Sequence, residues 1–144
     1  MLTFAAHSRV LLMLLAALLL AAGAGSADAQ DETPTAETAV TLFNQGQDAH
    51  EKGDLQKAIE LYQDALKILP EFPEAEYQRG NALVSLGQTI EAEKAFRKAV
   101  ELREDWPLAV TALGTILTRE GKYDEAEKLL GKAAGLDPAN AAAF

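Results

Sequence analysis

The chain has 144 residues, no cysteine and a formal net charge of −9. This length allows one domain of ordinary size, and the lack of cysteine excludes disulfides, thiolate metal sites and a cysteine nucleophile. The acidic balance argues against binding to the phosphates of nucleic acids or to anionic membrane surfaces.

The first 29 residues have the pattern of a signal peptide. A short, weakly basic start precedes an apolar run at residues 10–22, and small residues follow the run. Ala27 and Ala29 form the small-x-small site of signal peptidase, which predicts cleavage before Gln30. The run is short against the roughly 20 residues that span a membrane, and an uncleaved inner-membrane anchor is the alternative. We therefore expect an exported chain, periplasmic or extracellular, with no membrane attachment after cleavage.

Residues 30–38 are polar and are predicted to be a flexible lead-in. From residue 39 onward, small and large residues recur every 34 residues, and agreement of several columns at one period indicates internal repeats. The columns are a helix-glycine column (Gly46, Gly80, Gly114), a turn-glycine column (Gly53, Gly87, Gly121), a first alanine column (Ala58, Ala92, Ala126), a large-residue column (Tyr62, Phe96, Leu130) and a second alanine column (Ala65, Ala99, Ala133). The predicted units are 39–72, 73–106 and 107–140, and residues 141–144 are predicted to begin a truncated fourth unit.

Each unit is predicted to be a helix, a tight turn and a second helix. The turn glycines stand where the first helix must end, because glycine adopts positive φ without strain. Pro73 and Pro107 are expected to begin the next first helix, where a missing N–H costs nothing. Asp54 and Asp124 are expected to be N-caps of second helices.

Small residues in register also predict how each hairpin packs. The helix-glycine column is expected to face the first alanine column across the hairpin, so that the two helices approach closely. The large-residue column is then expected to fill the gap toward the next unit. Because one hairpin buries too little surface to be stable alone, the units must stack into a solenoid.

This set of columns resembles the tetratricopeptide repeat (TPR) over residues 39–140. The resemblance implies an all-α solenoid of three antiparallel helix pairs in a right-handed superhelix, preceded here by the apolar signal helix. The departures from the family pattern are expected to weaken single contacts and not the fold. They are Leu42, Glu76 and Val110 where the family often has tryptophan, Gln45 and Arg79 where it favours leucine, and Glu104 in place of a proline between repeats.

Residues for catalysis are scarce after the leader. Ser85 and His50 are the only serine and the only histidine after residue 29. They fall in different units, so a Ser-His-acid arrangement is not expected. His50 alone cannot make a zinc site of usual composition. The glycines follow the repeat and not a phosphate-binding loop. We therefore expect a protein that is not an enzyme and has no metal or cofactor.

In the family that the chain resembles, first helices line a concave groove that holds peptides or partner helices. The candidate groove residues are mostly uncharged, and amides and hydroxyls of this kind can bond to a peptide backbone. They are Phe43, Gln47, His50, Tyr77, Asn81, Val84, Thr111, Thr115 and Thr118. Ordinary hairpin packing is the alternative role for Phe43 and Tyr77.

Some TPR proteins hold a peptide's terminal carboxylate with a clamp of Lys or Arg and Asn side chains, and this chain lacks the cations of that clamp. The matching positions are Phe43, Gln47, Gln78, Leu108 and Ala112. The expected function is a non-catalytic scaffold that binds an unidentified protein or peptide. One alternative is an accessory TPR region of a larger exported enzyme, such as a glycosyltransferase or a protease, and another is a structural assembly subunit.

The C-terminal end of the third unit is expected to expose apolar surface. Nothing in the sequence after Leu129, Leu130, Ala133 and Leu136 is expected to cover these side chains. Terminal units of solenoids need a polar outer face. The last hairpin is therefore a candidate site of self-association.

Overall fold

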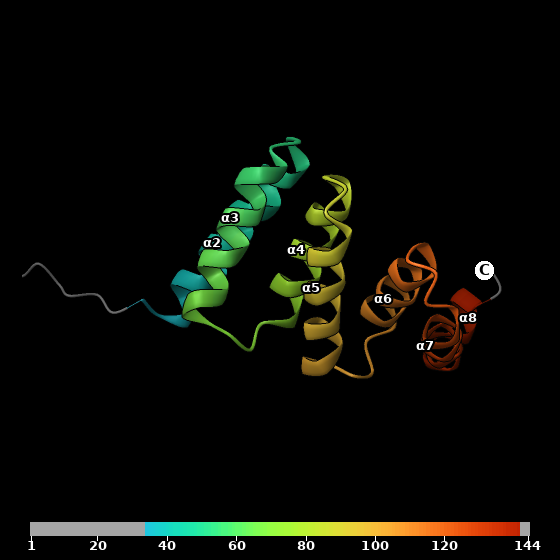
Figure 1. Ribbon diagram of the computed structural model, residues 1–144. Coiled ribbons are helices and arrows are strands. Elements are labelled where there is room, and N and C mark those ends of the chain that lie inside the picture. The colour runs from blue at the N-terminus through green and yellow to red at the C-terminus, as the bar shows by residue number, and fades with distance from the viewer. Residues whose placement is uncertain (1–33, 142–144) are drawn as a thin grey trace, which may run out of the picture. The chain divides into compact units, whose positions relative to one another are not determined.

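The computed structural model describes residues 34–141, and this part of the chain is helical, with no strand. Six long helices form three pairs, which follow one another in chain order (Figure 1). They are α2 (Ala36–Glu51), α3 (Leu55–Ile68), α4 (Pro73–Ser85), α5 (Thr89–Leu102), α6 (Pro107–Arg119) and α7 (Tyr123–Leu136), and the short α8 (Pro138–Ala141) follows. The predicted leader, residues 30–33 of the lead-in and residues 142–144 lie outside the described residues, and residues 36–38, which were expected to belong to the flexible lead-in, form the first turn of α2.

Contacts within pairs and between consecutive pairs produce the predicted stack of hairpins. Helix α2 packs on α3, α4 on α5, and α6 on α7. The second helix of one pair then packs on the first helix of the next, through α3 with α4 and α5 with α6. Within residues 34–141, no helix combines the length and the apolar character needed to cross a bilayer.

The turn glycines adopt the conformation that the sequence predicts. Gly53, Gly87 and Gly121 have φ values of 80°, 74° and 76°. At the first turn, the N–H of Gly53 donates to the carbonyl of His50, and the N–H of Asp54 donates to the carbonyl of Ala49, both at 2.9 Å. This is a Schellman motif, and the other two turns repeat its hydrogen bonds. Each first helix therefore ends in the same way.

The starts of the helices agree with most of the predictions. Pro73 begins α4, Pro107 begins α6, and the side chain of Asp54 caps α3 by accepting from the N–H of Lys57 at 3.4 Å. The prediction for Asp124 is wrong, because Lys122 is the N-cap of α7 and Asp124 lies in its first turn. The Schellman turn determines this start, since the residue after the turn glycine is the N-cap in every repeat.

The sequence analysis also predicted the wrong packing partner for the helix-glycine column (Gly46, Gly80, Gly114). These glycines face the large-residue column of their own hairpin, and not chiefly the first alanine column. A Cβ placed on Gly46 would lie 2.6 Å from Cε1 of Tyr62, and one placed on Gly80 would lie 2.5 Å from Cε1 of Phe96. The glycine therefore makes room for a ring inside the hairpin. Tyr62 and Phe96 are 0% and 2% exposed.

The third hairpin follows the same rule with an aliphatic side chain. A Cβ on Gly114 would lie 2.8 Å from Cγ and Cδ2 of Leu130, and the backbone carbonyl oxygen of Ala126 is 3.5 Å away. Both alanine columns are buried beside these contacts in all three hairpins. Close approach of the two helices thus depends on glycine opposite a large side chain, with alanine on either side.

Two departures from the family pattern compensate each other. Glu76 is 8% exposed and is the only buried charged residue within the described part of the chain. Arg79, one turn later on α4, donates to Oε2 of Glu76 from Nη2 at 2.5 Å and from Nε at 3.1 Å. A buried carboxylate requires such a partner. An ion pair therefore stands where the family favours two apolar residues.

Charged residues also connect the second helices of the last two pairs. Arg97 on α5 donates to Glu93 at 2.7 Å and to Glu125 on α7 at 2.6 Å, and Lys122 donates to Glu93 at 2.8 Å. Partial burial opposes ionisation of Glu93, but the hydrogen bonds from Lys122 and Arg97 prevail and lower the pKa of Glu93 to about 2. These ion pairs link α5 to the first turn of α7 and to its N-cap residue, Lys122.

The C-terminal end is less exposed than the sequence suggests. Helix α8 packs against α7, and Pro138 begins this helix. Ala133 is buried, Leu129 and Leu130 are partly buried, and Leu136 remains 39% exposed. Leu130 packs over Gly114 of its own hairpin and Leu129 packs against the core, so the expected exposure is wrong for Ala133 and holds for Leu136.

Candidate functional site

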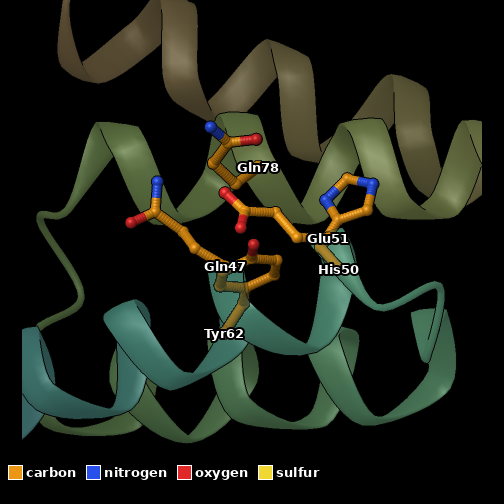
Figure 2. Close-up of a pocket in the computed structure, with 5 residues that line it drawn as sticks. All are labelled: Gln47, His50, Glu51, Tyr62 and Gln78. Carbon is orange, nitrogen blue, oxygen red and sulfur yellow. The ribbon is translucent and has the colours of Figure 1, made fainter.

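A polar pocket of about 240 Å³ opens between the first two helix pairs. Its lining comes from three helices: Gln47, His50 and Glu51 from α2, Tyr62 from α3, and Gln78 from α4. Figure 2 shows Tyr62 and Gln78 on opposite sides of the pocket, with Glu51 drawn between them. First helices of consecutive repeats thus place polar side chains around one space.

Tyr62 has two roles because its ring and its hydroxyl lie in different surroundings. The ring packs over Gly46 in the core, whereas the hydroxyl points toward Glu51 at the pocket (Figure 2). This hydroxyl is buried and has no hydrogen-bond partner among the described residues. Burial and then the negative charge of Glu51 raise the pKa of Tyr62 to about 12. The phenol therefore stays protonated at physiological pH and can donate a hydrogen bond.

Of the predicted groove residues, Gln47 and His50 line this pocket. Asn81 does not line the pocket, but its side-chain amide N–H donates to Oε1 of Gln78, which does, at 3.3 Å. Val84 is partly buried and packs against the core. The structure thus gathers the polar candidates of the first two repeats at neighbouring positions on α2 and α4.

The aromatic candidates Phe43 and Tyr77 are packing residues in this structure. The ring centroid of Phe43 lies 5.8 Å from that of Tyr62 and 4.9 Å from that of Phe72. One repeat later, the ring of Tyr77 lies 5.9 Å from Phe96 and 4.8 Å from Trp106. Both aromatic side chains are partly buried against the core cluster. The alternative role in hairpin packing explains their position, and a role in binding stays a prediction.

The three threonines of α6 lie outside this pocket. The hydroxyl of Thr115 donates to the carbonyl of Thr111 at 2.9 Å, and that of Thr118 donates to the carbonyl of Gly114 at 2.9 Å. Bonds of this kind occupy the hydroxyl donors within the helix. Toward a ligand, Thr115 and Thr118 therefore offer methyl groups and oxygen acceptors, and their contribution to binding stays a prediction.

Sequence reasoning did not assign Glu51 or Tyr62 to a binding surface. Tyr62 was placed in the large-residue column, where Phe96 and Leu130 are its counterparts. The signal was present, because Tyr62 is the one member of that column with a hydroxyl. A polar atom in a column of core residues requires a partner or access to solvent. Within residues 34–141, no cluster of histidine and acidic side chains has the geometry to hold a metal ion.

The stacked helical hairpins, with glycine opposite a large side chain in each hairpin, define a TPR-like repeat protein. The family model for the middle TPR-like domain of cilia and flagella-associated protein 70 matches residues 42–144. The chain belongs to this family of TPR-like domains. A comparison with curated proteins found no match.

Solved TPR domains have a similar fold. The first TPR domain of Spaghetti (RPAP3), bound to the HSP90 peptide SRMEEVD, is 24% identical with a TM-score of 0.69, over 72% of this chain and 82% of that chain. The second TPR domain of the same protein, bound to the same peptide, is 24% identical with a TM-score of 0.68. The match covers 71% of this chain and 94% of that chain. The TPR domain of OM64 from Arabidopsis is 24% identical with a TM-score of 0.69. The match covers 73% of this chain and 87% of that chain.

Proposed function

We propose that this chain is a non-catalytic binding module that holds an extended polypeptide segment across its first helices. The observation that carries the proposal is the polar pocket between α2 and α4, where side chains from consecutive repeats can contact one ligand. Membership of a TPR-like family and structural similarity to TPR domains that hold a peptide support it.

The charge of the pocket indicates which peptides are disfavoured. The HSP90 peptide SRMEEVD, which two similar domains bind, carries acidic residues. Here Glu51 brings a negative charge into the pocket, the positions that match a carboxylate clamp, Gln47 and Gln78 among them, carry no cation, and the chain has a net charge of −9. Like charges oppose association. The ligand of this module is therefore a neutral or basic segment.

Selection from a displayed peptide library on the immobilised full chain is expected to enrich segments that are poor in Asp and Glu. An enriched peptide should bind in a saturable manner by fluorescence anisotropy. The variant Gln47→Ala should weaken that binding about fivefold, because Gln47 lies in the pocket. The peptide SRMEEVD should bind more weakly than the enriched peptide.

The matched control is Gln56→Ala, which removes the same side chain from an exposed position on α3. This variant should bind like the original chain, and circular dichroism should show equal helicity for both variants. The proposal is wrong if no enriched peptide saturates the chain, or if both variants lose binding to the same extent.

We also propose that the chain is exported, on the basis of the signal-peptide pattern in residues 1–29. Expression with its own leader should yield a mature protein that begins at Gln30, as N-terminal sequencing can show. Recovery in the membrane fraction with Met1 retained would favour the uncleaved anchor instead, and recovery in the cytoplasm would contradict export.

A further inference from the structure

Two buried side-chain atoms of the described residues, the Tyr62 hydroxyl and Oε2 of Glu120, have no hydrogen-bond partner, and of these only the carboxylate has an ion pair, with Lys122 at 2.7 Å. Tyr62 is 0% exposed, and its hydroxyl has no hydrogen-bond partner among residues 34–141. An unpaired buried hydroxyl is costly, and such groups in native proteins need an explanation. Because Tyr62 lines a pocket and its hydroxyl points toward Glu51 on the same pocket (Figure 2), a ligand in the pocket can be the partner that the hydroxyl lacks.

The other side chains of the pocket restrict the chemistry of that ligand. Gln78 already accepts at Oε1 from Asn81, so it offers the ligand its amide N–H groups. Glu51 offers only acceptor oxygens when ionised. The pocket thus presents donors from Tyr62 and Gln78, and an acceptor from Glu51.

Simple charged groups satisfy only part of this pattern. A carboxylate could accept from Tyr62 and Gln78, but it would meet the like charge of Glu51. A guanidinium or an ammonium could pair with Glu51, but it has no acceptor for the Tyr62 hydroxyl. An amide has a carbonyl oxygen that accepts two hydrogen bonds and an N–H that donates one.

We propose that the pocket formed by Gln47, His50, Glu51, Tyr62 and Gln78 is an amide-binding subsite, in which the hydroxyl of Tyr62 donates to the ligand's carbonyl oxygen and Glu51 accepts from its N–H. The amide belongs to a bound polypeptide, as a main-chain peptide group or as the side chain of Asn or Gln. This inference rests on the proposed peptide-binding function and specifies one contact within it.

The subsite occurs once in the repeat pattern and therefore fixes the register of the ligand. The equivalent positions in the next two repeats carry Phe96 and Leu130, which have no hydroxyl. A bound segment would thus place one particular amide against the first repeat. Phe96 and Leu130 only pack inside their hairpins.

Small molecules test the subsite without knowledge of the partner. We would titrate the isotope-labelled full chain with N-methylacetamide, propionamide, acetate and methylguanidinium, and follow the side-chain amide signals of Gln47 and Gln78 by NMR. At least one of the two amides should give saturable shifts and bind more tightly than either ion. Tighter binding of N-methylacetamide indicates a main-chain group, and tighter binding of propionamide indicates a side chain.

The variant Tyr62→Phe retains the ring and removes only the hydroxyl. It should weaken amide binding about fivefold, as expected for the loss of one hydrogen bond. Tyr123→Phe is the matched control, because Tyr123 is 67% exposed and does not line this pocket. This control should leave amide binding unchanged.

Thermal unfolding separates the subsite from a purely structural role of the hydroxyl. Because the hydroxyl has no partner in the protein, Tyr62→Phe should melt at the same temperature as the original chain or at a higher one. A lower melting temperature would show that the hydroxyl is bonded within the protein and would overturn the inference. Tighter binding of acetate or methylguanidinium than of either amide would do the same.

The two proposals can fail separately. If an enriched peptide binds the original chain and Tyr62→Phe equally well, peptide binding stands and the amide subsite is wrong. If the amides bind in a Tyr62-dependent manner and no peptide binds, the subsite stands and the peptide-binding function is wrong.

Discussion

Replacing Phe96 by alanine is expected to lower the free energy of unfolding by about 3–5 kcal/mol. Phe96 is 2% exposed, packs over Gly80 inside the second hairpin and contacts the ring of Tyr77. The helix-glycine leaves no side chain that could move into the vacated space, so a cavity remains and adds to the loss of apolar burial. Urea unfolding followed by circular dichroism measures the effect.

Ile90→Ala is the control for this prediction, because Ile90 lies on the same helix and is 63% exposed. Its substitution should change the free energy of unfolding by no more than about 0.5 kcal/mol. Equal effects of the two substitutions would contradict the position of Phe96 at the centre of the second hairpin.

The second large effect is expected from Gly80→Ala, which adds a single methyl group. Alanine favours helices over glycine by about 1 kcal/mol, but here its Cβ would lie 2.5 Å from Cε1 of Phe96. The ring is buried and cannot move away without disturbing its neighbours. We therefore expect a net loss of about 1–3 kcal/mol in the free energy of unfolding, measured by urea unfolding.

Two comparisons isolate the contact between the glycine and the ring. Gly131→Ala should stabilise the protein by about 0.5–1 kcal/mol, because Gly131 lies within α7 and a Cβ there would meet no atom within 4 Å. In a Phe96→Ala background, Gly80→Ala should no longer destabilise, since the clash is gone. A loss that persists in this double variant would show that the ring is not the cause.

Much of the fold was open to prediction because its determinants are local. A turn glycine ends each first helix through hydrogen bonds that span six residues, and a proline begins the next first helix. The local rule for N-caps failed at one helix, α7. Asp124 has the residue type of an N-cap, but the turn before it places the cap at Lys122.

The site was less open to prediction because its residues come from three helices. The residue types of Gln47 and His50 and the family resemblance were enough to place them on a groove. The same reasoning placed Phe43 and Tyr77 there, although both pack against aromatic residues of the following segments. Whether an aromatic side chain faces a ligand or a neighbouring helix depends on the angle between the helices. The 34-residue sequence repeat does not predict that angle.

The sequence by itself determined the period of 34 residues, the order of helices and turns, and the columns of small and large residues. These features follow from backbone preferences of glycine and proline and from the spacing of side chains on a helix.

Only the tertiary structure decided which side chains meet. It placed the ring of Tyr62 over Gly46, paired Arg79 with the buried Glu76, and left the Tyr62 hydroxyl unpartnered at the pocket. Each of these outcomes depends on how closely two surfaces approach in three dimensions, and a difference of a few ångströms decides between a clash, a hydrogen bond and an open space for a ligand.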